Sequence, residues 1–177
     1  MAAPIFPTGV NAQGAVKVTW VQTLTTPASP SLAEINAGTS LDVSLMLYEG
    51  GWQPGVNANK VSAKRRLASR KVYEKFGTTT ETMADLSYSF DPQAAAGSNG
   101  KKAFEKFIEG TTGYFVERLG LDASSVDFAV GQFVNVYPVV LGPQTPVADT
   151  SDEAAEVQIV QQVGITGQSQ KNKAIVA

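Results

Sequence analysis

Apolar and polar residues alternate along several stretches of this chain, a two-residue period that is typical of β-strands with one buried face. In the stretch 15–26, Val18, Trp20 and Leu24 fall on one face, and β-branched residues are frequent. We expect seven strands, at 15–26, 39–47, 70–77, 80–90, 112–120, 127–142 and 154–166. Proline cannot donate to a ladder, so Pro138 predicts an edge position or a break in the sixth strand.

Two short stretches carry helical signals instead. Ser31 precedes Glu34 by three residues, which is the capping-box pattern, and we expect a short helix over 31–37. Its residues Leu32 and Ile35 should face inward, and Gly38 should provide a left-handed stop.

The second helix is expected over 101–109. Ser98 or Asn99 should cap it, Gly110 should end it, and Lys101 and Glu105 are spaced to form an ion pair. Its expected apolar stripe is Phe104, Phe107 and Ile108.

The remaining segments are expected to be loops and arms. Glycine and proline at 50–55 predict a loop over about 49–59, and the basic run that follows is expected to continue as a loop. We expect one domain over 1–177, with an extended N-terminal arm at 1–13, a β-rich core at 14–166 and an extended C-terminal arm at 167–177. The fold class is therefore mainly β: a single-domain β-sandwich or curled β-barrel of about seven strands, with one flanking α-helix and a short capped helical turn.

Composition excludes several kinds of chemistry. The 177 residues include no histidine and no cysteine, so neither Ser-His-Asp nor Cys-His catalysis is available. The chain start lacks a basic segment followed by an apolar one, and no apolar run reaches the ~20 residues that span a bilayer. We expect a soluble protein made in the cytoplasm, with no cofactor and no membrane partner.

The chain matches none of the common patterns of phosphate, carboxylate or calcium sites. The loop GSNGKK at 97–102 lacks the first glycine and the final Ser or Thr of a phosphate-binding loop. Glu105 and Glu109 lie one helical turn apart, which does not place two carboxylates across a cleft. The acids between 149 and 156 lack the spacing of a calcium-binding loop. These features predict ordinary loops and solvated faces, and we expect no enzyme.

Charge is unevenly distributed. Residues 60–75 hold seven of the fourteen basic residues, whereas residues 121–170 hold six acids and no base. The basic run could bind phosphate groups of nucleic acid, but no aromatic residue is interleaved within 60–71 for base stacking. A solvated or partner-facing patch is the stronger interpretation. Trp52, in a glycine-rich loop, could equally anchor an interface or cover the core.

Four segments follow one another within residues 30–91: PSLAEINAGT (30–39), a G-W-x-P turn at 51–54, R-L-x-S at 66–69 and Y-x-x-D at 88–91. In this order they resemble the tail tube proteins of long-tailed (siphovirus-type) bacteriophages, in particular the actinobacterial phage type. The segment GYFVER at 113–118 and the layout of the second half are also similar.

The resemblance implies a structural virion protein of the tail. Such subunits form rings, typically hexameric, that stack head to tail around a tape-measure protein and conduct DNA to the host cell. They also meet a tail terminator and a distal tail protein. Assembly would take place in the host cytoplasm, and DNA would pass through the lumen without specific binding.

Two sets of residues are candidates for these roles. Unlike charges on different surfaces of one chain would meet when subunits stack, so interfaces between subunits or rings are expected to include Trp52, Pro54, Lys64, Arg65, Arg66, Arg70, Lys71, Asp149, Asp152 and Glu153. Neutral or acidic side chains would line a lumen that does not retain DNA, and the candidates are Glu156, Gln158 and Gln162.

Three other interpretations remain open from the sequence. One is a virion ring protein that does not polymerise, such as a tail terminator or head–tail connector. Another is a carbohydrate-binding β-sandwich, for which Trp52, Tyr48 and Tyr73 are the nearby aromatic residues. The third is a hydrolase that uses Asp or Glu, for which no motif was found.

Overall fold

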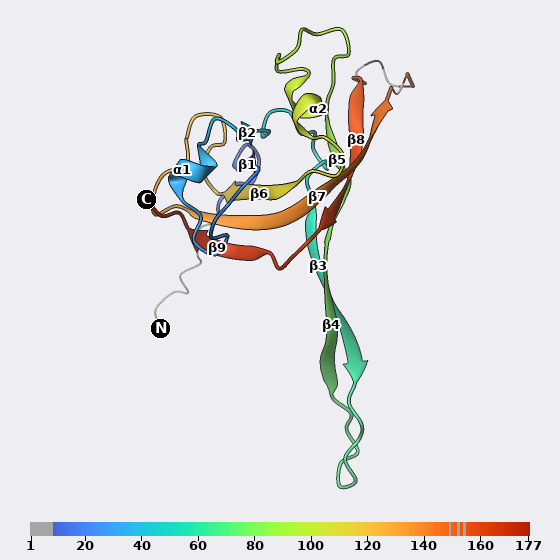
Figure 1. Ribbon diagram of the computed structural model, residues 1–177. Helices are drawn as coiled ribbons and strands as arrows, with labels where there is room; N and C mark the ends of the chain where they lie inside the picture. The colour runs from blue at the N-terminus through green and yellow to red at the C-terminus, as the bar shows by residue number, and fades with distance from the viewer. Residues whose placement is uncertain (1–8, 149, 152, 154) are drawn as a thin grey trace, which may run out of the picture. The chain divides into compact units, whose positions relative to one another are not determined.

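The computed structural model describes residues 9–148, 150, 151, 153 and 155–177. The fold is mainly β, which confirms the predicted class (Figure 1). The strands are β1 (Val16–Val21), β2 (Leu41–Asp42), β3 (Pro54–Ser62), β4 (Glu74–Met83), β5 (Leu86–Ser89), β6 (Thr112–Leu119), β7 (Phe133–Val147), β8 (Gln158–Ile165) and β9 (Gln170–Ala174). The two helices are α1 (Leu32–Ile35) and α2 (Lys102–Lys106).

The chain folds as two compact units that share β7. The described part of unit 1 comprises 9–47, 112–139 and 169–177, and unit 2 comprises 48–111 and 140–168 apart from the three undescribed positions. Hydrogen-bonded neighbours follow the order β2-β1-β6-β7-β8-β5, with β9 also paired to β7, and β3 and β4 form a separate two-stranded sheet.

In unit 1, β1 lies between β2 and β6, so its backbone is paired on both sides. Trp20 and Phe115 pack edge to face, with ring centroids 5.0 Å apart, and both are almost fully buried. Gly113 is required beside them, because a Cβ there would lie 2.5 Å from the Trp20 ring. The adjoining core cluster is Val21, Leu24, Ile35, Val116, Phe128, Val134, Val136 and Ile175.

A buried cation holds a long loop of unit 1 in place. Arg118 of β6 is 1% exposed, and its guanidinium donates to the backbone oxygens of Asp122, Val126 and Asp127 at 2.8–2.9 Å. Burial lowers the pKa of this guanidinium, and the nearby aspartates oppose that shift. One arginine thus satisfies carbonyl groups that the irregular chain between β6 and β7 leaves without a strand partner.

The predicted capped helix is confirmed as α1. The Ser31 hydroxyl accepts a hydrogen bond from the Glu34 N–H at 3.2 Å and donates to the Glu34 carboxylate at 2.9 Å. Glu34 also accepts from the N–H and the hydroxyl of Thr25, which ties the turn to the end of the first strand region. Ile35 enters the core as expected, but Gly38 has no positive φ, so the predicted left-handed stop is wrong.

In unit 2, a buried glutamine links β8 to its neighbours. Gln161 is 0% exposed; its amide nitrogen donates to the backbone oxygens of Phe107 and Gly142 at 2.8 and 2.9 Å. Its amide oxygen accepts from the Tyr88 hydroxyl at 3.0 Å, and that hydroxyl accepts from Gln144 at 2.8 Å. The polar groups are therefore paired inside the core, and burial raises the pKa of Tyr88 above its usual range.

Three expected strands differ in extent. The strand at 39–47 is limited to β2, because the Asp42 carboxylate accepts from the Ser44 N–H and turns follow. The single expected strand 80–90 is divided at 84–85 between β4 and β5. Strand β7 begins at Phe133, not at 127, and continues to Val147.

Pro138 does not break β7 or place it at an edge, so that prediction is wrong. The strand pairs with β9 over 133–136. Farther along, Gly142 lies against Gln162 and Val140 against Gly164 of β8. Pro138 falls between these two stretches, where the neighbouring strand changes and a missing N–H is tolerated.

Two further expectations are corrected. Residues 170–174 form β9 and are not an extended arm, whereas of the expected N-terminal arm residues 1–8 lie outside the described structure. Helix α2 is shorter than expected and has no side-chain cap from Ser98 or Asn99. Glu105 accepts from the Gly97 N–H at 2.9 Å and is not paired with Lys101. Phe107 is buried and Phe104 half-buried, but Ile108 is 63% exposed, so the expected apolar stripe is only partly formed.

Candidate assembly surface

The most exposed regular structure in unit 2 is the hairpin of β3 and β4. Its antiparallel register runs from the pair Pro54–Met83 to the pair Ser62–Glu74, with a shift between Ala58 and Lys60. The predicted loop at 49–59 is therefore wrong beyond residue 53. The expected strand at 70–77 begins only at Glu74 and continues to Met83. Figure 1 shows the two strands extending together away from the other strands of unit 2.

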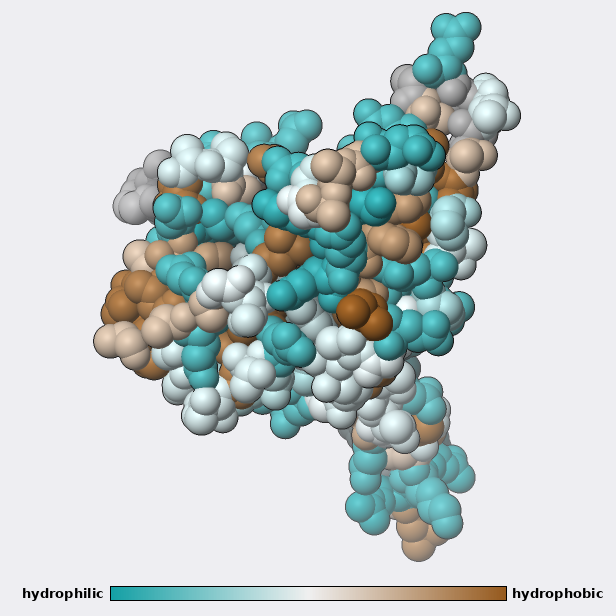
Figure 2. Space-filling model, turned by 45° about the horizontal axis from the view of Figure 1, so that its top comes forward, coloured by the Kyte–Doolittle hydropathy of each residue, from teal (hydrophilic) through white to brown (hydrophobic). Residues whose placement is uncertain are grey.

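Beyond its root, where Met83 is buried, neither face of this hairpin is covered by the described chain. Six of the nine residues in β3 and eight of the ten in β4 are exposed. Apolar side chains are among them: Phe76 is 74% exposed and Tyr73, in the connecting loop, 67%. Figure 2 shows such apolar positions scattered among hydrophilic ones along the hairpin. A two-stranded ribbon is marginally stable alone in water, so this surface is suited to being covered by another molecule.

The end of the hairpin carries the basic run. The connecting loop closes through the Ala63 N–H, which donates to the Tyr73 carbonyl, and a turn at 67–68 forms its tip. The exposed cations that the loop brings together are Lys64, Arg65, Arg66, Arg70 and Lys71. The hairpin 54–83 holds seven basic and two acidic residues, a net charge of +5, while the other residues hold seven basic and fourteen acidic ones, a net charge of −7.

The other expected interface residues are distributed differently. Trp52 and Pro54 are half-buried at the root of the hairpin, so they are not part of the basic tip. Glu153 is exposed, whereas Asp149 and Asp152 lie outside the described residues.

The expected lumen residues lie before and within β8. Glu156 is exposed and accepts a hydrogen bond from the Tyr48 hydroxyl at 2.7 Å. Burial and this carboxylate together raise the pKa of Tyr48 to about 12. Gln158 is half-buried and accepts from the Ser87 hydroxyl at 2.6 Å, and Gln162 is exposed. Gln158 and Gln162 share the face of β8 opposite buried Ile159 and Gln161.

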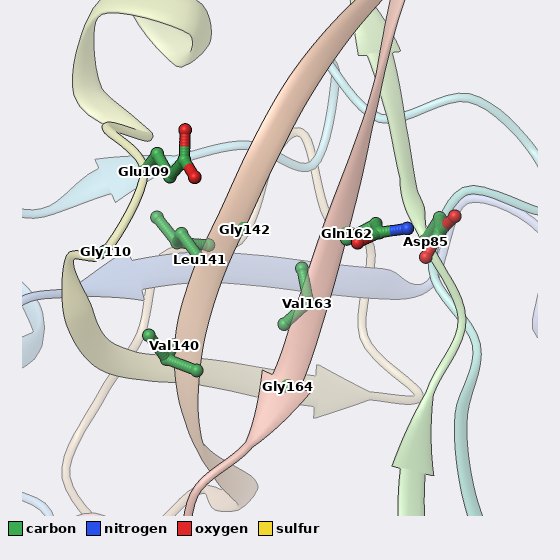
Figure 3. A pocket seen from close by; sticks show the side chains of 9 residues that line it. All are labelled: Asp85, Glu109, Gly110, Val140, Leu141, Gly142, Gln162, Val163 and Gly164. Atoms are coloured by element: carbon green, nitrogen blue, oxygen red, sulfur yellow. The ribbon is translucent and has the colours of Figure 1, made fainter.

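Unit 2 also carries an open depression of about 470 Å³, which no motif in the sequence marks. Its floor is formed by neighbouring parts of β7 and β8, with Asp85 and Glu109 at its margins (Figure 3). Gly110, Gly142 and Gly164 line the depression, and any side chain at these positions would fill part of it. The lining residues are Asp85, Glu109, Gly110, Val140, Leu141, Gly142, Gln162, Val163 and Gly164. They are far apart in sequence, and only strand pairing brings them together.

The described residues contain no group of three or more His, Cys, Asp or Glu that could hold a metal ion. Within the same residues, no helix is both long and apolar enough to cross a membrane.

Comparison with known proteins provides an independent line of evidence. The family model described as phage tail tube protein matches residues 3–177. No curated protein sequence matches the chain. The match includes the exposed hairpin, both units and β9, and agrees with the resemblance seen in residues 30–91. The chain belongs to the phage tail tube protein family and is a structural protein of the virion tail.

Proposed function

We propose that this chain, acting as one tail tube domain, forms closed rings, hexameric by the resemblance, that stack head to tail into the tube of a siphovirus-type tail. The tube conducts DNA during ejection into the host. The subunits assemble in the host cytoplasm around a tape-measure protein, between a tail terminator and a distal tail protein. The actinobacterial phage type rests on residues 30–91 alone.

The observation that carries the proposal is the exposed, basic hairpin on an otherwise acidic chain. A head-to-tail stack brings different surfaces of identical subunits together, so a cationic arm meets anionic surface in the next ring. The proposed contact surface comprises Trp52 and Pro54 at the root, the basic tip, and the acids Asp149, Asp152 and Glu153. Glu156 and Gln158 are proposed to face the lumen, where cationic groups would retain DNA. Gln162, the third lumen candidate, lines the depression on unit 2 and is proposed to contact a neighbouring subunit instead.

Electron microscopy of the purified protein, alone and with its tape-measure protein, tests the proposal. Long hollow tubes with a regular axial repeat are the expected result. Tube length should fall as salt rises, because exposed charges attract less strongly at high ionic strength. Persistent monomers under both conditions would overturn the proposal.

A charge-reversal variant tests the role of the tip. Arg65→Glu with Arg66→Glu should abolish tube growth and leave folded subunits, since both side chains are exposed. As a control, Glu49→Lys with Asp91→Lys reverses two exposed charges outside the proposed contact surface, and tubes should still grow. Single closed rings that never stack in the wild type would favour the second candidate, a tail terminator or head–tail connector.

A further inference from the structure

The tip of the hairpin combines charge with one apolar side chain. Leu67 is fully exposed, at 106%, in the turn at 67–68. Arg65 and Arg66 precede it, and Arg70 follows three residues later; all three are exposed. An apolar side chain surrounded by cations has the form of an interface anchor with a charged rim.

The depression on unit 2 has the complementary form. Its floor includes Val140 and Val163, which are half-buried, and its margins carry the exposed carboxylates of Asp85 and Glu109. Neither carboxylate is paired with a cation of the described chain. Figure 3 shows the two carboxylates on different sides of the β7–β8 floor.

We propose that this depression receives the hairpin tip of a second copy of the chain, with Leu67 on the apolar floor and the tip arginines paired with Asp85 and Glu109. The inference rests on the stacking proposed above. It seats the tip on Asp85 and Glu109, so the acids Asp149, Asp152 and Glu153 would meet another part of the neighbouring subunits. Asp85 follows β4 by two residues and lies at the root of its own hairpin. Nine residues of β3 span about 30 Å. The tip therefore docks on another copy and not on its own root.

Disulfide trapping between different subunits tests this contact directly, because the chain contains no cysteine. Ala68→Cys subunits are mixed with Gln162→Cys subunits, which leaves Leu67 and both carboxylates in place. Mild oxidation during tube assembly should yield a dimer whose linked peptides contain positions 68 and 162. A disulfide forms only where Cα atoms approach within ~7 Å, so the product reports docking.

A matched mixture uses Ala68→Cys with Ala155→Cys, which places the second thiol beside the acids of 153–156. Trapping at 162 and not at 155 is the expected result. Trapping at 155 and not at 162, or tubes without trapping at 162, would overturn the docking site while leaving tube formation intact. Failure of the wild type to form tubes would instead overturn the function on which the inference rests.

A charge swap provides a second, non-covalent test. Asp85→Lys with Glu109→Lys should lower the yield of the 68–162 dimer at least about tenfold, because two attractive pairs become repulsive. Adding Arg65→Glu and Arg66→Glu to the partner carrying Ala68→Cys should restore the yield. The control Glu49→Lys with Asp91→Lys, two exposed acids outside the proposed contacts, should leave the yield unchanged. No loss with the first pair, or no restoration by the swap, would contradict the pairing.

Discussion

Strands β1 and β4 have opposite surroundings although both are rich in β-branched residues. Five of the six residues of β1 are buried, and its backbone pairs with β2 and β6. In β4 only Met83 is buried, and its single partner is β3. The comparison teaches that the same local preference for β-structure forms a buried strand in one place and, in the other, a strand that is exposed over most of its length. In a protein family that assembles into a tube, the buried strand can stabilise the subunit, and the exposed strand remains available for contacts with other subunits.

The largest expected contrast is between aromatic truncations in the two regions. Trp20→Ala should lower the free energy of unfolding by about 3–5 kcal/mol, because a large buried ring is lost from beside Phe115. Phe76→Ala on the hairpin should change it by less than about 0.5 kcal/mol. Urea denaturation of the unassembled subunits measures both. Equal losses would mean that the hairpin is packed in the free subunit.

Polar groups inside the core should give the next largest effect. Gln161→Ala should cost roughly 2–3 kcal/mol, because the carbonyls of Phe107 and Gly142 and the Tyr88 hydroxyl lose partners in a buried site. Tyr88→Phe removes one hydroxyl, which donates to Gln161 and accepts from Gln144, and should cost about half as much. Denaturation midpoints of the two variants check this order, and a reversed order would contradict the pairing described for Gln161.

The capped turn should contribute less, and its contribution should depend on pH. Ser31→Ala should cost about 1 kcal/mol at pH 7. Hydrogen bonds from Thr25, and then Ser31, lower the pKa of Glu34 from 4.5 to about 2 against a small opposing effect of burial. The ionised carboxylate therefore stabilises the fold above pH 4.5, and this stabilisation is lost as pH falls towards 2.

Glu34→Gln isolates that ionisation. The variant should be less stable than the wild type at pH 7, and the difference should narrow between pH 4.5 and 2. Chemical denaturation at several pH values measures this narrowing. A constant difference over that range would show that the carboxylate charge adds nothing beyond its hydrogen-bond acceptors.

Removing most of the hairpin should have the smallest effect on the free subunit and a complete effect on assembly. Val56 and Glu81 are paired, so an Asn-Gly turn can join them in place of 57–80. The free energy of unfolding should change by less than about 1 kcal/mol, since the deleted residues cover no core. Tubes should be absent by electron microscopy. Tubes of normal length would contradict the proposed role of the tip.

The sequence predicted best where the signals are local. The pair Ser31 and Glu34 specifies α1 within four residues, and alternation identified the buried face of β8. It failed where partners far along the chain decide the outcome. Residues 54–59 contain proline, glycine and asparagine and appear to be a loop by composition, but pairing with 79–83 makes them a strand. Polar residues 170–174 become β9 because β7 offers an open edge.

The candidate site was predicted in part for the same reason. The basic run is contiguous, so its clustering was visible in the sequence and the hairpin places it at one tip. The depression is assembled from residues near 85, 110, 140 and 164, and no motif marks that juxtaposition. Among the acids, Glu156 already accepts a hydrogen bond from the Tyr48 hydroxyl, a contact across 108 residues that no local pattern indicates. The contacts between subunits involve residues of two copies of the chain. Local patterns within one copy therefore do not identify which groups meet.

The hairpin also has a mechanical consequence. A ribbon fixed at one end and about 30 Å long acts as a lever, so a 5° rotation at its root displaces the tip by roughly 2.6 Å. If the tip is docked on a neighbouring subunit, small tilts between adjacent subunits can be taken up by bending of the β3–β4 hairpin. The docked contact at the tip can then stay in place. A tube linked by such arms can curve smoothly while its rings stay rigid.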